Sequence, residues 1–140
     1  MSVRAQRVIL LVLAASGLYV GLWGLADPSA FYRSFPGFGR HWINVDGPYN
    51  QHLIRDVAAF YTALAVLNIV AALRAEQLLI WTAGVVWVVF SVPHLAYHAS
   101  HLDHYGTFDK VANMISLGGT LVLAALLLLP AKSTHGPGAR

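Results

Sequence analysis

The chain has 140 residues, of which 57% are hydrophobic and only 11% are charged. Soluble domains carry about 25% charged residues, so this composition excludes an ordinary soluble domain and indicates an integral membrane protein. The net charge of +3 is spread over loops and tails without a basic patch, so we expect no nucleic-acid partner. The absence of cysteine excludes disulfides and thiolate metal sites.

Four apolar segments predict an all-α fold, a polytopic integral membrane four-helix bundle. Each segment is close to the ~20 residues that an α-helix needs to cross ~30 Å of hydrocarbon. The predicted helices cover residues 7–26, 48–74, 77–101 and 109–129. They form one domain of residues 1–130, which a disordered polar tail follows at residues 131–140.

The first apolar segment has a basic start, so a cleavable signal peptide is an alternative to a membrane helix. The apolar run continues as far as Ala26, which is long for a signal peptide and favours a transmembrane helix. Gly17 and Gly21 form a GxxxG pattern within it. That spacing permits another helix to pack closely, but it does not identify the helix.

The connection at residues 27–47 is rich in glycine, proline and aromatic residues, which predicts an ordered surface loop with room for a short interfacial helix. Gly47 and Pro48 resemble a helix start with proline in the first turn, so we expect the second helix to begin at Pro48. The two later connections are short, which predicts that the helices they join are antiparallel neighbours.

Four histidines lie near the end of the third apolar segment. His94, His98 and His101 are separated by four and then three residues, so they share one face of a helix, and His104 follows them. The second helix carries His52 and Asp56 at a spacing of four. A shared face indicates a shared ligand.

Depth in the membrane places polar residues of three helices at one level. Counting ~1.5 Å per residue from the centre of each apolar segment puts His94, Asp56 and Asn113 ~9–12 Å from the midplane, inside the ~15 Å half-thickness of hydrocarbon. A second layer at roughly 15–18 Å holds one residue from each helix, namely His98, His52 and Asp109. Ionisable groups within a membrane normally face the protein interior, so we expect these residues to line one cavity.

Histidine and carboxylate side chains are the ligands that zinc and non-haem iron take in such sites. The predicted metal ligands are His94, His98, Asp56, His52 and His101. Residues expected to support these ligands by hydrogen bonds are Asp109, Asn113 and His104. Haem b, held between a histidine of the second helix and one of the third, is the other cofactor that the pattern allows. In the structural alternative, the histidines only bond water, headgroups and one another.

These features predict a cavity near one membrane face and an oxidoreductase or hydrolase that acts on a lipid-soluble substrate. Two alternatives stay open: a non-catalytic accessory subunit of a larger membrane complex, and a small proton-coupled carrier. The expected partners are the lipid bilayer, a lipid-soluble small molecule, and a membrane protein or a second copy of this chain. Five Lys and Arg residues on the side of the termini, against four on the other, favour cytoplasmic termini.

The first helix ends in GLADP, a loop with aromatic residues follows, and the next helix reads LIRDVAAFYTALAVLNIVAAL. Over residues 8 to about 90, this order resembles the DoxX-like group of small bacterial four-helix membrane proteins. The resemblance implies the four-helix bundle and a bacterial inner membrane, but no single activity. The histidines at positions 94–104 lie outside it.

Overall fold

The computed structural model describes residues 1–131 and contains four long helices. They are α1 (Val3–Ala26), α3 (Gln51–Arg74), α4 (Gln77–Ser100) and α5 (Thr107–Leu127). Two short elements complete the fold: the helix α2 (Pro28–Ser34) and the 3-10 helix η1 (Leu102–His104). All four long helices are long and apolar enough to cross a membrane, which confirms the predicted all-α membrane fold. Of the predicted disordered tail, residues 132–140 lie outside the described part of the chain.

Two helix starts in the first connection are decided by side-chain caps. The helix α3 begins at Gln51 rather than at Pro48, because Asn50 accepts a hydrogen bond from the Leu53 nitrogen at 3.1 Å. Asparagine is among the residues most favoured at the N-cap of a helix. The helix start predicted at Pro48 was therefore wrong by three residues. The short helix expected in this connection is confirmed as α2, which Asp27 caps.

Small residues bring α1 and α3 into close contact. A Cβ added to Gly17 would lie 3.2 Å from the Ala65 Cβ, and one added to Gly24 would lie 2.7 Å from the Ala58 Cβ. Within a membrane, such small residues let helix backbones approach and gain dispersion contacts. The glycine pattern of the first helix therefore serves the contact with α3.

The second close pair is α4 with α5. A Cβ at Gly84 would lie 3.0 Å from the Leu127 Cβ and 3.1 Å from the Ala124 carbonyl oxygen. The two pairs meet in a hydrophobic core near the N-terminus and the α3–α4 connection. Its largest fully buried apolar side chains are Leu10, Leu13, Ile80, Trp87 and Leu127.

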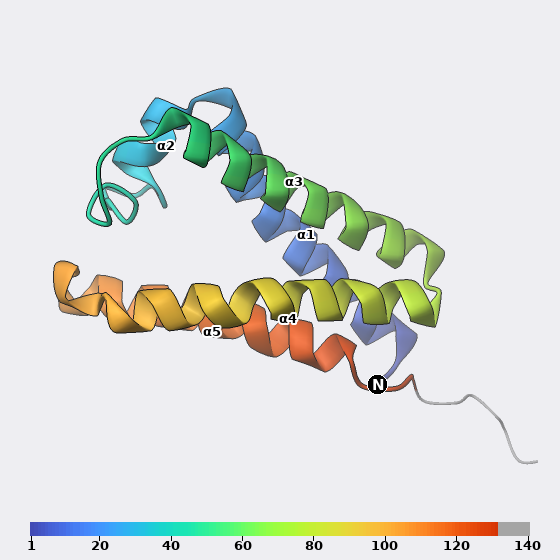
Figure 1. Cartoon of the computed structure of the whole chain (residues 1–140). Coiled ribbons are helices and arrows are strands. Elements are labelled where there is room, and N and C mark those ends of the chain that lie inside the picture. Colours follow the sequence, from blue (N-terminus) through green and yellow to red (C-terminus); the bar gives the residue numbers. More distant parts are fainter. Residues whose placement is uncertain (132–140) are drawn as a thin grey trace, which may run out of the picture.

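The two helix pairs do not stay together along their whole length. Figure 1 shows that α3 and α4 lie close at their connection and separate toward the opposite end, where the loop after α2 lies. Aromatic rings of α2 and this loop occupy that end, with centroids 4.7 Å apart for Phe31 and Phe35 and 6.2 Å for Phe35 and Trp42. The loop thus forms a roof between the separated helices.

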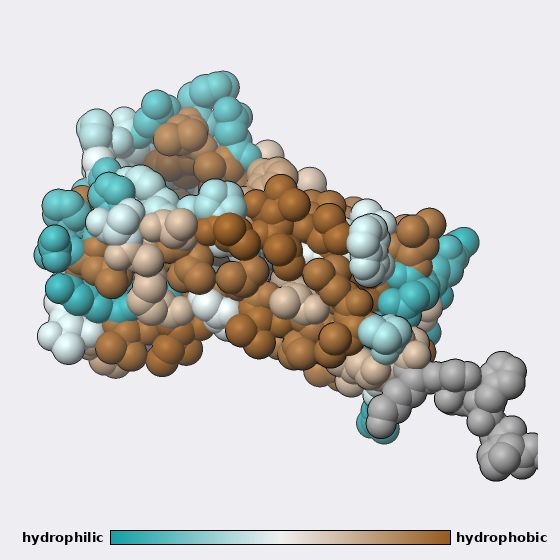
Figure 2. Space-filling view, turned by 60° about the horizontal axis from the view of Figure 1, so that its bottom comes forward, coloured by the Kyte–Doolittle hydropathy of each residue, from teal (hydrophilic) through white to brown (hydrophobic). Residues whose placement is uncertain are grey.

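The outer surface matches a membrane environment. Figure 2 shows a hydrophobic surface along the middle of the molecule and hydrophilic residues gathered toward its ends. Many large apolar side chains on this surface are more than half exposed, for example Leu78, Val89 and Ile115. Contact with lipid hydrocarbon accounts for such exposure, since lipid tails solvate these side chains as well as a protein core would.

Candidate functional site

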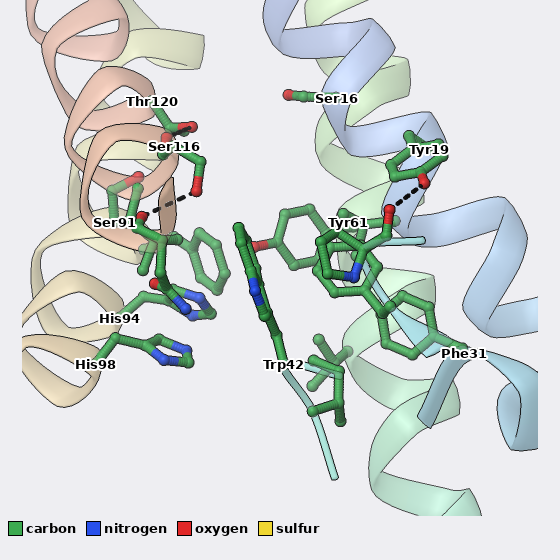
Figure 3. A pocket seen from close by; sticks show the side chains of 18 of the residues that line it. Ser16, Tyr19, Phe31, Trp42, Tyr61, Ser91, His94, His98, Ser116 and Thr120 are labelled. Atoms are coloured by element: carbon green, nitrogen blue, oxygen red, sulfur yellow. Dashed lines mark hydrogen bonds between the residues drawn. The ribbon is translucent and has the colours of Figure 1, made fainter. Parts of the chain in front are cut away.

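A cavity of about 340 Å³ lies between the two helix pairs, beneath the roof formed by the loop after α2. All four long helices contribute to its walls. Seven of its nineteen lining residues are aromatic, namely Tyr19, Phe31, Phe35, Trp42, Tyr61, Trp87 and Phe90. Figure 3 shows His94 and His98 on one wall and Tyr19, Tyr61 and Phe31 on the other.

The histidine wall comes from the last turns of α4. His94 and His98 are one turn apart, and their ring centroids lie 4.9 Å from each other. Phe90, one turn earlier, lies 5.0 Å from the His94 ring, so the three rings form a continuous row along α4. Sequence spacing alone predicted this shared face.

His101 and His104 do not join that wall. The helix α4 ends at Ser100, and the His101 ring instead stacks on Tyr97 at 4.2 Å and bonds the Tyr97 carbonyl oxygen at 2.8 Å. His104 belongs to η1, beyond the end of α4, and is exposed. His101 therefore does not share the helix face of His94 and His98, because α4 ends before it.

His52 and Asp56 lie away from the cavity. His52 Nε2 lies 3.1 Å from Asp56 Oδ2 on the outer side of α3, and the two side chains are 88% and 61% exposed. The inward face of α3 near this level is set by Ile54 and Ala58, which are buried against α1. Asp56 is two residues from each of them, which is about 200° around a helix, so it points outward.

Asp109 is engaged by the roof rather than by a histidine. Its carboxylate accepts hydrogen bonds from Trp42 Nε1 at 3.0 Å and from the Arg40 guanidinium at 3.3 Å. The same guanidinium lies 4.3 Å from the centre of the Phe108 ring. These contacts fasten the roof to the start of α5, since charge-assisted bonds are the stronger class of hydrogen bond.

The carboxylate beside the histidine wall is Asp46, which sequence reasoning missed. Its Oδ2 lies 4.0 Å from His98 Nδ1. The hydroxyl of Tyr105 donates to this carboxylate at 3.2 Å, and it lies 2.9 Å from the Trp42 carbonyl oxygen as well. Asp46 belongs to a loop without periodicity, and its long-range bond to Tyr105 holds it beside His98. No pattern in the sequence points to this position.

The protonated hydroxyl of Tyr105 holds the roof in place through Asp46 and the Trp42 carbonyl oxygen. Burial, and then the neighbouring Asp46 carboxylate, raise the pKa of Tyr105 above its ordinary value of 10.0. Burial disfavours the charged phenolate, and the neighbouring carboxylate disfavours a second negative charge beside it. The roof contact therefore depends on a hydroxyl that stays protonated at neutral pH.

Four buried polar atoms of residues that line the cavity have no hydrogen-bond partner among the described residues. They are Trp87 Nε1, Ser91 Oγ, His98 Nδ1 and Asn113 Oδ1. Each belongs to a residue that lines the cavity, and we call them the four free polar atoms. Nearly all buried polar groups in proteins are paired, so four such atoms at one cavity need an explanation.

The structure brings together His94, His98 and Asn113 of the predicted site, and it separates them from Asp56 and His52. Among residues 1–131, no three His, Asp or Glu side chains are grouped as a metal ion would require. The five predicted ligands thus do not surround one point in this arrangement. Metal binding and haem binding stay predictions.

Comparison with known proteins finds no relative. No family model matches the chain, and neither curated proteins nor solved structures give a significant match. The four-helix membrane architecture is supported by the structure itself, and the DoxX-like resemblance stays a prediction. The cavity is therefore the feature of the structure that bears on function.

Proposed function

We propose that this membrane protein binds a small lipid-soluble molecule whose ring-sized head forms hydrogen bonds inside the cavity. The observation that carries this proposal is the group of four free polar atoms belonging to residues that line a largely apolar pocket. Leaving a buried polar atom without a partner costs about 1–3 kcal/mol, and a bound polar head would remove that cost. An aromatic lining supplies flat apolar surface for a ring.

The four free polar atoms also describe the head of the ligand. Trp87 Nε1 can only donate a hydrogen bond, Asn113 Oδ1 can only accept one, and Ser91 Oγ can do both. A head that satisfies them carries a donor and an acceptor close together, as a phenolic hydroxyl does. The cavity volume of about 340 Å³ is at the lower end of ligand pockets, which fits one or two rings.

His94 and His98 would be the groups that exchange protons with such a head. An imidazole nitrogen can donate or accept a hydrogen bond or a proton, and Asp46 Oδ2 lies 4.0 Å from His98 Nδ1. An oxidoreductase and a hydrolase would each need a proton donor or acceptor at this position. We keep both reactions as proposals for the same cavity.

A metal ion, if the protein takes one, would be held by the neighbouring pair His94 and His98. The remaining ligands would have to come from the bound molecule or from water, because His52 and Asp56 point away. Zinc and iron sites with few protein ligands are typical of metals that bind their substrate directly. Metal analysis of the purified protein therefore accompanies the binding experiment below.

The binding experiment compares 2-naphthol with naphthalene, which differ only in the hydroxyl group. The protein is placed in lipid nanodiscs, and binding is measured by equilibrium dialysis against empty nanodiscs to correct for partition into lipid. Pairing the free polar atoms is worth about 1–3 kcal/mol, so 2-naphthol should bind about 5- to 140-fold more tightly than naphthalene.

Two variants and one control assign the effect to the cavity. Ser91→Ala and Asn113→Leu should each reduce the preference for 2-naphthol, because each removes a polar atom from the wall. Asp56→Asn is the matched control, since its exposed side chain lies outside the cavity. Equal binding of the two probes, or an unchanged preference in both variants, would contradict the proposal. A stoichiometric partner that copurifies would favour the accessory-subunit alternative.

A further inference from the structure

The lining of the cavity differs between its two sides. On the side of α3 and α4, aromatic rings close the wall, with centroids 5.2 Å apart for Phe60 and Phe90 and 5.1 Å apart for Tyr61 and Phe90. On the side of α1 and α5, three small hydroxyl residues, Ser16, Ser116 and Thr120, line the cavity together with Tyr19, Val20, Asn113 and Leu117.

Exposure and position indicate an opening of the cavity at these hydroxyl residues, which form its rim. Ser16 and Ser116 both line the cavity and are exposed. Figure 3 shows Ser16 across the cavity from Ser116 and Thr120. At ~1.5 Å per residue, all three lie within ~5 Å of the centres of their helices, so the opening is at mid-membrane depth.

The hydroxyl groups of the rim already have hydrogen-bond partners within their own helices. Ser16 donates to the Leu13 carbonyl oxygen, Ser116 to that of Asn113, and Thr120 to that of Ser116, each at 2.9 Å. Serine and threonine satisfy their hydroxyls in this way within apolar surroundings. An alkyl chain can therefore lie between these residues without leaving a hydroxyl unpaired.

The opposite end of the cavity is covered. The roof is fastened to the start of α5 by the Asp109 bonds and to Tyr105 through Asp46. Its rings, including Trp42 and Phe35, line the cavity from that end. At ~1.5 Å per residue, His94 and His98 lie ~8 Å and ~14 Å from the centre of α4, toward the roof, whereas the opening lies near mid-membrane depth.

We propose that the ligand is a single-chain amphiphile that enters from the bilayer between α1 and α5, with its head at His94 and His98 and its chain leaving between Ser16 and Ser116. This rests on the proposed function, because it assumes that the cavity binds a polar head. The volume of about 340 Å³ holds a ring-sized head but not a whole lipid, so the chain must remain outside.

The test uses 4-methylphenol and 4-dodecylphenol, which share a head and differ in the chain. Ser116→Phe places a ring in the opening, and Val89→Phe places one on the outer surface of α4, where Val89 is 68% exposed. In nanodiscs, Ser116→Phe should weaken binding of 4-dodecylphenol at least tenfold and change that of 4-methylphenol less than twofold. Val89→Phe should change neither. An equal effect of Ser116→Phe on both phenols, or no effect on either, would overturn the proposal.

A second measurement does not depend on the folding of any variant. A 4-dodecylphenol with a diazirine at the end of its chain is photolysed in nanodiscs with the unmodified protein, and adducts removed by excess unlabelled 4-dodecylphenol are mapped by mass spectrometry. They should lie on outward residues of α1 and α5, such as Val12 and Val122. Competed adducts on the outer faces of α3 and α4 would overturn the proposal. Failure of 4-methylphenol to bind at all would refute the proposed function instead.

Discussion

Replacing Gly21 with alanine perturbs the contact between α1 and α3 that supports one wall of the cavity. A Cβ at this position would lie 2.9 Å from the Ala58 carbonyl oxygen and 2.9 Å from the Thr62 nitrogen. Both are backbone atoms of α3, so they cannot rotate away as a flexible side chain would. The helices must separate, and overpacking of this kind costs about 1–3 kcal/mol.

Gly118→Ala in α5 is the matched control. Among the described residues, no heavy atom outside its own helix backbone lies within 4 Å of a Cβ added there. Alanine is favoured over glycine inside a helix by about 1 kcal/mol, and this gain is common to both variants. Gly21→Ala should therefore be less stable than Gly118→Ala by about 1–3 kcal/mol.

The assay is reversible unfolding of both variants in the same mild detergent, followed by circular dichroism and by steric trapping. Binding of 2-naphthol is measured alongside, and it should weaken in Gly21→Ala because Tyr19 and Val20 line the cavity beside this contact. Equal stability of the two variants, or a gain in stability for Gly21→Ala, would refute the packing argument.

Three further predictions follow from the site. Because the pKa of Tyr105 is raised above 10.0, its protonated form stabilises the roof fully below pH ~10, and this stabilisation is lost as the pH rises above that. Near-ultraviolet circular dichroism should show that loss, and Tyr105→Phe should not. Asn113→Leu removes a buried free oxygen, so it should raise the thermal midpoint of the empty protein by the equivalent of about 1–3 kcal/mol while weakening 2-naphthol binding. An unchanged midpoint would contradict this. Zinc or iron that copurifies should be lost in both His94→Ala and His98→Ala and kept in Asp56→Ala, as measured by mass spectrometry; loss in Asp56→Ala would place that carboxylate at the site.

The sequence by itself determined the membrane fold. Backbone groups in hydrocarbon must be paired within the spanning segment, so long apolar stretches become helices whatever they pack against. Spacing within a helix is equally local, and it predicted that His94 and His98 share a face. The same spacing does not place His101 on that face, because α4 ends at Ser100.

Depth along the membrane could be counted from the sequence, but rotation about a helix axis could not. Asp56 is at the level expected, yet it points outward because Ile54 and Ala58 pack against α1. The rotation of α3 about its axis is set by the close approach of Gly21 and Gly24 of α1, which no property of α3 alone reveals. A residue at the right depth can therefore face lipid, headgroup or cavity.

Only the tertiary structure decided what completes the cavity. The separation of the two helix pairs leaves a space, and a loop without periodicity fills its end with Trp42 and places Asp46 beside His98. These positions depend on bonds to Tyr105 and Asp109, about sixty residues away along the chain. Local pattern determines which segments span the membrane, whereas contacts between distant segments determine which of their side chains meet.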